Sequence, residues 1–244
     1  MEKKSPFGQQ KVLVTGGTRG IGEAIAKHLL DLGANVLITG SYYRQGWWEN
    51  ESYCDFKVVD FDDDKQCDLF LNEISRKGIN YLVNCAGIVN KVNVENLSQK
   101  ELLRTNQLNF SLPIGIIKAL IPSMKKNRFG RIVNIASIAA LQHRVGSIAY
   151  SSSKSALITA TRVLALELAR FNILVNAVSP GYTDTEMMNT LDIKTKEHLI
   201  DQVPLKRLCT TKEIAETVLF LLNPENKYIT GHNLIIDGGI TLKQ

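Results

Sequence analysis

Residues 131–154 hold three side chains whose types and spacing suit a single proton transfer. Ser137 follows a short β-branched run at residues 131–135, and Tyr150 and Lys154 lie four residues apart. On a helix, residues four apart project from the same face, one turn from each other. Open α/β sheets bind their ligands just past the ends of their strands, which is where Ser137 is expected.

The Tyr150/Lys154 pair has two interpretations. A tyrosine is a poor acid–base catalyst because the pKa of its phenol is about 10. An ammonium about 4 Å away, at an effective dielectric of about 20, would attract the phenolate by about 4 kcal/mol and bring the pKa of Tyr150 close to neutrality. The same pair is also common on helices as a plain i,i+4 contact. The rest of the chain must show whether the pair is catalytic or only a helix contact.

The start of the chain predicts the first βα unit of a nucleotide-binding fold. An apolar, β-rich run at residues 11–15 precedes a glycine-rich turn and then a helical pattern. Glycines permit a tight turn close to a pyrophosphate, and the helix amino terminus near Gly20 offers free N–H groups. The spacing, G-x-x-x-G-x-G, differs from the G-x-G-x-x-G fingerprint. The turn and the first residues of the helix include Gly16, Thr18, Arg19, Gly20 and Ile21, all candidate cofactor contacts.

The end of the second expected strand, residues 35–39, bears on the choice of cofactor. In dinucleotide-binding folds an acidic residue at this point binds the ribose 2'-hydroxyl, whereas basic residues accept a 2'-phosphate. Here Ser41 follows the strand and no carboxylate occurs until Glu49, while Arg19 lies in the glycine turn and Arg44 lies just downstream of the strand. The pattern favours NADP(H) over NAD(H).

Strand and helix patterns alternate along the rest of the chain. Further strands are expected at residues 56–59, 81–85, 131–135, 174–178 and 233–236, and the capping box of Ser98 and Glu101 begins a long helix to about residue 126. This alternation predicts a single-domain α/β protein over residues 1–244, with a Rossmann-like, doubly wound, seven-stranded parallel sheet and helices on both faces.

Several residues after these strands are expected at the carboxyl edge of the sheet, where the cofactor would lie. They are Asp60 and Phe61 at the adenine, Asn84, Ala86 and Gly87 after the fourth strand, and Pro180 and Gly181 after the sixth. The region of about residues 182–208 is rich in Met and Thr with weak periodicity, as in a substrate lid. Trp47 and Trp48 have no obvious core partner, and either a cover for the adenine or a subunit contact is open to them.

Composition excludes several classes of function. With 44% hydrophobic and 22% charged residues among 244, the chain can bury the core of one α/β domain. It has no run of about 18 apolar residues and no apolar signal-peptide core at its start, so cytoplasmic residence without membrane contact is expected. The net charge of +5 is not concentrated in a basic block, which argues against nucleic acid. The four cysteines lack metal-ligand spacing, so they are expected to be structural, with no metal bound.

These motifs together resemble those of the short-chain dehydrogenases/reductases, in the family's order and over nearly the whole chain. The matching stretches are residues 15–22 (TGGTRGIG), 84–87 (NCAG), Asn106, Ser137, residues 150–154 (YSSSK), 178–181 (VSPG), 229–231 (ITG) and 237–239 (DGG).

The resemblance implies an NADP(H)-dependent oxidoreductase that reduces a ketone to a secondary alcohol, or the reverse. Tyr150 would give the proton to a carbonyl oxygen held by Ser137. Lys154 would bind the nicotinamide ribose and lower the pKa of Tyr150, and Asn106 would anchor a water that links Lys154 to solvent. The implied cofactor contacts are Gly16, Arg19 and Ile21 at the phosphates, Asp60 and Phe61 at the adenine, Asn84 at the adenosine ribose, Thr183 at the carboxamide, and Tyr150 and Lys154 themselves.

The substrate is less defined. The expected contacts are Ser137, Gln142, Tyr150 and Met187, the last giving an adaptable apolar side. The 3-oxoacyl-acyl-carrier-protein reductases look similar and bind their carrier through two arginines. One matches Arg128, while the other falls on Phe171 with Arg170 beside it, so the carrier stays open as a partner. A third helix between residues 41 and 56 is expected to be missing or reduced to a turn.

Two alternatives stay open at this stage. Asn90, Gln142 and His143 would suit a dehydrogenase of a sugar or another polar metabolite. A catalytically silent, cofactor-binding regulatory protein would need none of the proton-transfer residues. The resemblance also implies a homo-oligomer, a dimer or a tetramer, because in the family the long helices that carry Asn106 and Tyr150 pair across subunits.

Overall fold

The computed structural model describes residues 6–43 and 45–242 of the 244-residue chain. Within these ranges one sheet contains seven strands in the order β3-β2-β1-β4-β5-β6-β7, and all neighbours are parallel. The strands are β1 (Lys11–Val14), β2 (Asn35–Gly40), β3 (Cys54–Val58), β4 (Tyr81–Asn84), β5 (Gly130–Ile135), β6 (Ile173–Pro180) and β7 (Asn233–Ile236). The doubly wound parallel sheet predicted from the sequence is confirmed.

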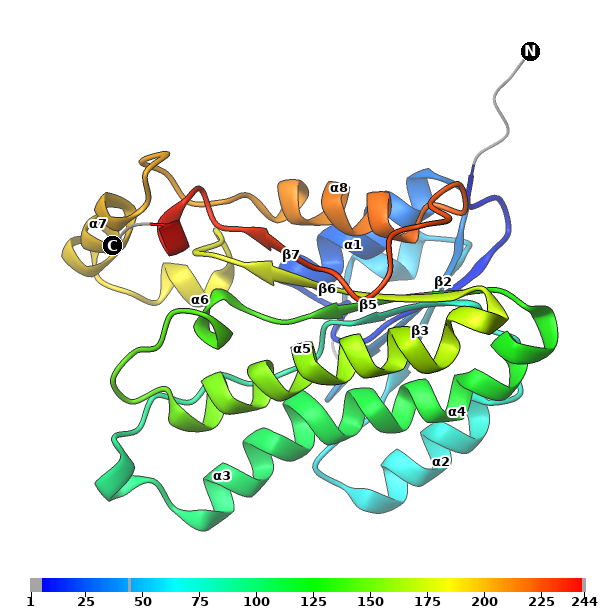
Figure 1. The fold of residues 1–244 in the computed structure, drawn as a ribbon, viewed down its shortest axis with the longest axis horizontal. Coiled ribbons are helices and arrows are strands. Elements are labelled where there is room, and N and C mark those ends of the chain that lie inside the picture. The colour runs from blue at the N-terminus through cyan, green and yellow to red at the C-terminus, as the bar shows by residue number, and fades with distance from the viewer. Residues whose placement is uncertain (1–5, 44, 243–244) are drawn as a thin grey trace.

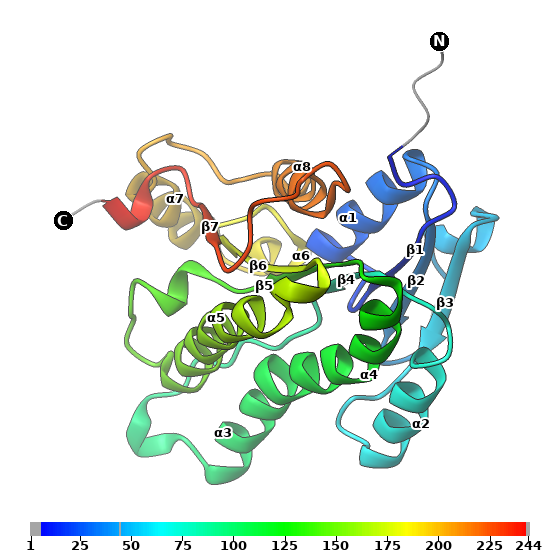
Figure 2. The same ribbon diagram turned by 45° about the vertical axis from the view of Figure 1, so that its right-hand side comes forward.

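Helices cover both faces of this sheet (Figures 1 and 2). The helices of the described chain are α1 (Gly20–Asp31), α2 (Asp64–Ile74), α3 (Gln99–Asn106), α4 (Leu112–Asn127), α5 (Ile148–Leu168), α6 (Glu186–Asn189), α7 (Ile193–Gln202) and α8 (Thr211–Leu222). Ile25 of α1 and Val218 of α8 belong to the apolar core on one face, whereas Phe70 of α2 and Ile116 of α4 belong to the core on the other. The sheet is therefore the middle layer of three.

A single 3-10 turn, Trp47–Asn50, connects β2 to β3, which confirms that the third helix is reduced to a turn. Trp48 is buried, and its ring centroid lies 4.6 Å from that of Phe56. The ammonium of Lys27 lies 5.2 Å from the Trp47 ring. Trp48 is thus a core residue of this connection, and the expectation that it lacks a core partner is wrong.

The long helix expected after the capping box is interrupted. Ser98 and Glu101 cap α3 as predicted, but residues Gln107–Ser111 form a π-helical segment before α4 begins at Leu112. Pro113 lacks an N–H, so it cannot donate the α-helical hydrogen bond to the carbonyl of Asn109. π-helical segments change which side chains share a face and are frequent at functional sites.

Because all strands are parallel, the loops that follow them meet at one edge of the sheet. The hydroxyl of Thr15, after β1, accepts hydrogen bonds from the N–H groups of Cys85 and Ala86 at 3.0 Å each, which ties two of these loops together. Figure 1 shows α6 and α7 beyond this carboxyl edge, at the end where α5 begins. Within residues 6–43 and 45–242, no helix combines the length and the apolar character needed to cross a membrane.

Candidate active site

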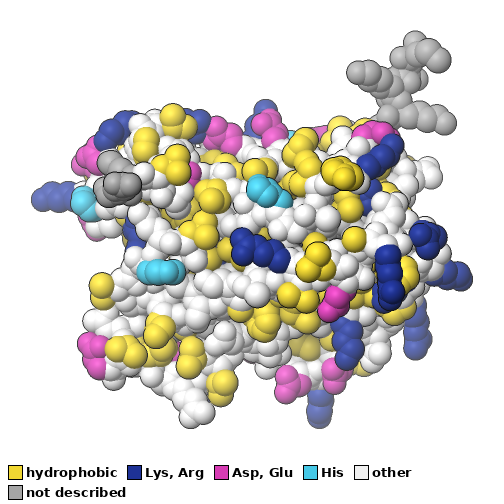
Figure 3. Space-filling model, in the orientation of Figure 1, with side chains coloured by type: hydrophobic (Ala, Val, Ile, Leu, Met, Phe, Trp, Pro, Cys, Tyr) yellow, Lys and Arg dark blue, Asp and Glu magenta, His cyan; other side chains and the backbone are white. Residues whose placement is uncertain are grey.

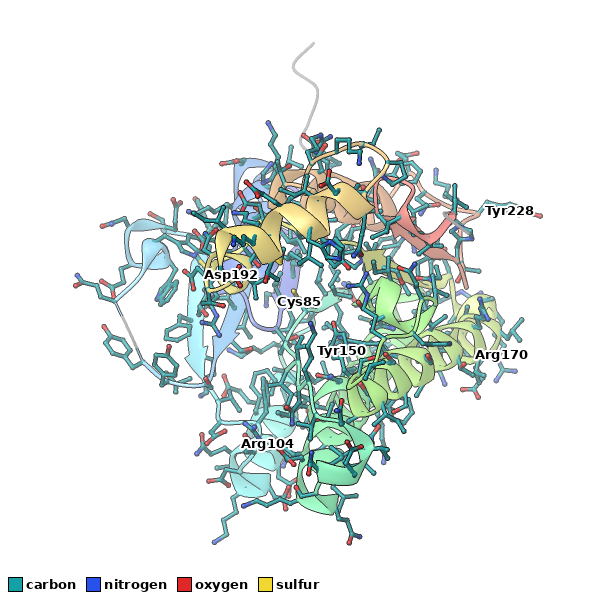
Figure 4. All side chains as sticks on the ribbon, turned by 90° about the vertical axis from the view of Figure 1, so that its left-hand side faces the viewer. Cys85, Arg104, Tyr150, Arg170, Asp192 and Tyr228 are labelled. Atoms are coloured by element: carbon teal, nitrogen blue, oxygen red, sulfur yellow. The ribbon has the colours of Figure 1, made fainter. Side chains whose placement is uncertain are left out.

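Ser137 and Tyr150 meet at the carboxyl edge. Ser137 lies just past β5 and precedes a short 3-10 turn, where its hydroxyl accepts a hydrogen bond from the Ala139 N–H at 3.1 Å. Tyr150 projects from the first turn of α5. Figure 4 looks onto this edge and places Tyr150 and Cys85 near its centre, below α7, which begins after Asp192. The proposed proton donor therefore faces the region where parallel sheets bind ligands.

Burial raises the pKa of Tyr150 above its usual value, and a hydrogen bond with Ser137 offsets only part of that rise. The ammonium of Lys154 lies 5.9 Å from the centroid of the Tyr150 ring. It donates instead to the carbonyl of Ile135 at 2.7 Å. The prediction that Lys154 brings the pKa of Tyr150 close to neutrality is therefore wrong for this geometry, because desolvation dominates. Burial thus disfavours the phenolate form of Tyr150.

Lys154 is 5% exposed. Burial lowers the pKa of its ammonium to about 8. The side chain is still largely protonated at neutral pH, but it loses its charge far more readily than an exposed lysine. Its surroundings make it a titrating group in the range where enzymes work.

Asn109, and not Asn106, lies on the side of Gly87 that Lys154 also approaches. Its amide exchanges hydrogen bonds with the backbone of Ile88, at 2.8 Å to the N–H and 2.9 Å to the carbonyl, and donates to Ser153 Oγ at 3.1 Å. A Cβ at Gly87 would lie 2.8 Å from Asn109 Oδ1 and 3.5 Å from Lys154 Nζ. Both polar groups therefore converge on Gly87.

Asn106 lies one turn earlier and faces elsewhere. Its amide donates to the Leu102 carbonyl at 3.0 Å within α3, and its side chain lines a surface cavity with Phe61 and Arg104. The assignment of Asn106 to the catalytic set is therefore wrong. The π-helical segment explains the error, because it changes the helical register between the two asparagines. Spacing in the sequence carries no signal that separates Asn109 from Asn106.

The glycine turn forms a cradle at the start of α1. Gly16 has a φ of +66°, and a Cβ there would lie 3.0 Å from the backbone of Ala86. Its N–H donates to the hydroxyl of Thr39 at 3.2 Å. Arg19 is the N-cap of α1 in extended conformation, and among the described contacts no side chain caps this helix start. The turn, which also contains Thr18, Gly20 and Ile21, thus suits the phosphates of a dinucleotide.

Arg19 points from this turn toward the segment that follows β6. Its guanidinium lies 3.6 Å from the carboxylate of Glu186 in α6, and both side chains are exposed. Ser41 is exposed just past the end of β2. Arg44, the other basic residue of the cofactor hypothesis, lies outside the described residues.

Two of the expected cofactor contacts have buried side chains. The Phe61 ring is 8% exposed and packs edge-on against Phe70, with ring centroids 5.7 Å apart. Asn84 is 2% exposed and donates to the Asn134 carboxamide at 2.8 Å. Neither side chain is available to an adenosine group, so the structure corrects both as side-chain contacts. Asp60 is half-buried, and its carboxylate accepts from the Asp62 N–H at 3.0 Å.

The loop after β6 completes the edge. Pro180 ends the strand, and a Cβ at Gly181 would lie 2.8 Å from the backbone of Asp237. Thr183 is buried, and its hydroxyl donates to the Gly181 carbonyl at 3.1 Å. Together with Ala86 and Gly87, these residues form a narrow floor of backbone that larger side chains would fill.

The substrate side is only partly defined. The carboxamide oxygen of Gln142 is buried and has no hydrogen-bond partner within the described part of the chain. Asn90 is already engaged, because it donates to Glu101 at 3.2 Å. His143 lines a cavity of about 620 Å³ whose lining includes neither Ser137 nor Tyr150. The side chain of Met187 lies outside what the structure describes.

Comparison with known proteins agrees with this geometry. A family model described as enoyl-(acyl carrier protein) reductase matches residues 16–241. The chain is 36% identical to the 3-oxoacyl-[acyl-carrier-protein] reductase FabG of Aquifex aeolicus, over 93% of this chain and 96% of the relative. It is 32% identical to the acetoacetyl-CoA reductase of an Acinetobacter strain, over 95% of this chain and 98% of the relative. The solved structure of ElxO with NADP bound superposes with a TM-score of 0.87 and 32% identity, over 96% and 100% of the two chains.

Proposed function

The chain belongs to the short-chain dehydrogenase/reductase family, and we propose that it reduces a 3-oxoacyl thioester to the 3-hydroxyacyl thioester with NADPH. It is an oxidoreductase with a nicotinamide cofactor. The observation that carries the proposal is the meeting of Ser137, Tyr150 and Lys154 with the glycine turn at one edge of the sheet.

When bound, the nicotinamide supplies the hydride. Tyr150 donates the proton to the carbonyl oxygen of the substrate. Ser137, already hydrogen-bonded to Tyr150, holds the same oxygen. Lys154 presents an ammonium for the ribose hydroxyls, and Asn109 fixes the backbone of Ile88 and Gly87 beside it. The protein contributes position and electrostatics, while its own side chains move only the proton.

The residues of the site fit a nicotinamide dinucleotide. Gly16 and Gly87 lie where added Cβ atoms would meet the Ala86 backbone and the Asn109 amide, so the floor of the cradle stays open only because these positions lack side chains. The start of α1 lies next to this floor and favours negative charge.

NADPH is proposed over NADH because of the charges around the adenosine end. Arg19 extends from the glycine turn, and no carboxylate follows directly at the end of β2, where Ser41 stands. The 2'-phosphate of NADPH could pair with the guanidinium of Arg19, and no carboxylate at the end of β2 would repel it. ElxO, with 32% identity, was solved with NADP, which supports the same choice.

A ketone on an acyl thioester is favoured over a polar metabolite. Both curated relatives reduce 3-oxoacyl groups by name, one on acyl carrier protein and one on CoA. Asn90, a residue that motivated the sugar alternative, is already bonded to Glu101. A silent regulatory protein would have no need for the complete set of proton-transfer residues, which this chain retains.

We propose separately where an acyl carrier protein would bind. Arg128 donates to the Arg170 carbonyl at 3.1 Å, and Lys125 and Arg170 both lie over the Phe171 ring, at 4.6 and 4.8 Å. This basic group precedes β5 and β6 and so lies at the amino edge, about 20 Å, or one strand length, from the catalytic edge of the same chain. Figure 3 shows many of the Lys and Arg side chains of that face toward this end. Binding of an acidic carrier there is proposed only together with an oligomer that brings the group near a second active site.

Initial rates with NADPH and with NADH across acetoacetyl-CoA, a longer 3-oxoacyl-CoA, 3-oxoacyl carrier protein, a sugar ketone and a small ketone test the proposal. We expect the thioesters with NADPH to have the highest kcat/KM. Turnover of the sugar alone, or a preference for NADH, would overturn the proposed function.

Light scattering at micromolar concentration tests the proposed dimer or tetramer, and a monomeric mass would exclude both. Cytoplasmic residence stays a prediction.

A further inference from the structure

Residues 182–208 leave the sheet after β6 and return to their starting point. The N–H of Asp184 donates to the Cys209 carbonyl, and the N–H of Cys209 donates to the Tyr182 carbonyl, each at 2.8 Å. This segment therefore has a closed base and carries α6 and α7 above the catalytic edge. The end of α7 makes further contacts.

Gln202, the last residue of α7, lies at the centre of those contacts. Its carboxamide oxygen accepts from Arg144 Nη2 at 3.0 Å and from the Tyr182 hydroxyl at 3.3 Å. Its amide nitrogen lies 2.9 Å from His198 Nε2. The Arg144 guanidinium also stacks over the Tyr182 ring, 4.8 Å from the centroid. One carboxamide thus joins α7 to two other parts of the chain.

Arg144 belongs to the opposite wall of the site. Its carbonyl accepts from the Ser147 hydroxyl at 2.6 Å, and the Ser147 and Ser151 hydroxyls lie 2.9 Å apart. Ser147 immediately precedes α5, and Ser151 follows Tyr150 in its first turn. The backbone of Arg144 is therefore anchored to the helix that carries the proton donor.

We propose that Arg144 and Gln202 form a latch that holds residues 182–208 closed against the wall that carries Tyr150, and that both are positioning residues for the substrate. A hydrogen bond to a guanidinium is among the stronger ones in proteins, and here the stacking on Tyr182 fixes the direction of the donor. Opening the segment requires this bond to break. The kinetic part of the proposal rests on the proposed function, whereas the closed state of the segment does not.

Four variants test the latch: Arg144→Met, Gln202→Leu, the double variant and Gln202→Glu. In each of the first two, KM for the thioester should rise about tenfold, while Kd for NADPH changes less than twofold. The effects of the two substitutions should be less than additive in the double variant, because both single variants remove the bond between Arg144 and Gln202. Gln202→Glu should lower both KM and kcat, because a charge-assisted bond slows opening. Arg76→Met, an exposed arginine after α2, is the matched control.

Hydrogen exchange of residues 182–208 supplies a readout that needs no substrate. Exchange should be faster in Arg144→Met and Gln202→Leu, slower in Gln202→Glu, and unchanged in Arg76→Met. Unchanged exchange in the single variants, or additive effects in the double variant, would overturn the latch. If exchange changes as expected but no thioester is reduced, the proposed function fails and the latch stands.

Discussion

Asn109 donates to the hydroxyl of Ser153 at 3.1 Å, and that hydroxyl donates to the Tyr150 carbonyl at 2.8 Å. The π-helical segment between α3 and α4 is thereby connected to the turn of α5 that carries the proton donor. Since Asn109 also holds both backbone groups of Ile88, one buried side chain positions the floor of the cofactor site and the catalytic helix together.

This relationship predicts a large difference between two asparagines one turn apart. Asn109→Ala should lower kcat about 100-fold, because the Ile88 backbone and Ser153 lose their shared partner. Asn106→Ala, the matched variant, should stay within about twofold of the wild-type kcat. Steady-state kinetics check both, and the melting temperature shows whether Asn109→Ala is folded. A larger loss in Asn106→Ala would restore the original assignment.

The ion pair between Arg19 and Glu186 predicts opposite effects on cofactor affinity. Arg19→Ala should weaken NADPH binding about tenfold and leave NADH nearly unchanged, because only NADPH offers a 2'-phosphate. Glu186→Gln should strengthen NADPH binding by about twofold to threefold, since an exposed carboxylate competes only weakly for Arg19. Fluorescence titration with both cofactors measures these changes. Equal losses of both cofactors in Arg19→Ala would refute its role.

The lowered pKa of Lys154 predicts how binding depends on pH. The ammonium is the form that binds the ribose hydroxyls, and it is lost as pH rises through about 8. NADPH affinity should therefore be constant near pH 7 and fall above about pH 8, whereas Lys154→Met should bind more weakly without a step in this range. Titrations from about pH 6.5 to about pH 9.5, roughly one and a half pH units on either side of the pKa, measure the profile. A wild-type profile that is flat to the upper limit would contradict the assignment.

The layers and strand positions could be predicted because most of the parallel strands are short apolar runs next to a turn. The seven expected strands were found, most with ends shifted by one or two residues. The packing of Trp48 could not be predicted, because its partner Phe56 is brought close only by the folded connection between β2 and β3. Helix α6 has four residues, too few for a periodic pattern.

Some residues of the candidate site could also be predicted from the sequence, and others could not. Ser137, Tyr150 and Lys154 could be found because Ser137 directly follows a predicted strand and the other two share one helical register. Asn109 could not be distinguished from Asn106 by spacing alone, since a π-helical segment changes the register between them. The pKa of Tyr150 also depends on burial, which the sequence estimate did not include. The contact between Arg144 and Gln202 joins residues far apart in the chain, so only the fold reveals it.

Proton donation by Tyr150 is the central claim, and Tyr150→Phe tests it most directly. The variant keeps the ring and removes only the hydroxyl. With NADPH and a 3-oxoacyl thioester that the wild-type protein reduces, kcat should fall about 1,000-fold while Kd for NADPH stays within about threefold. Turnover within tenfold of the wild type, with the cofactor bound normally, would contradict the account.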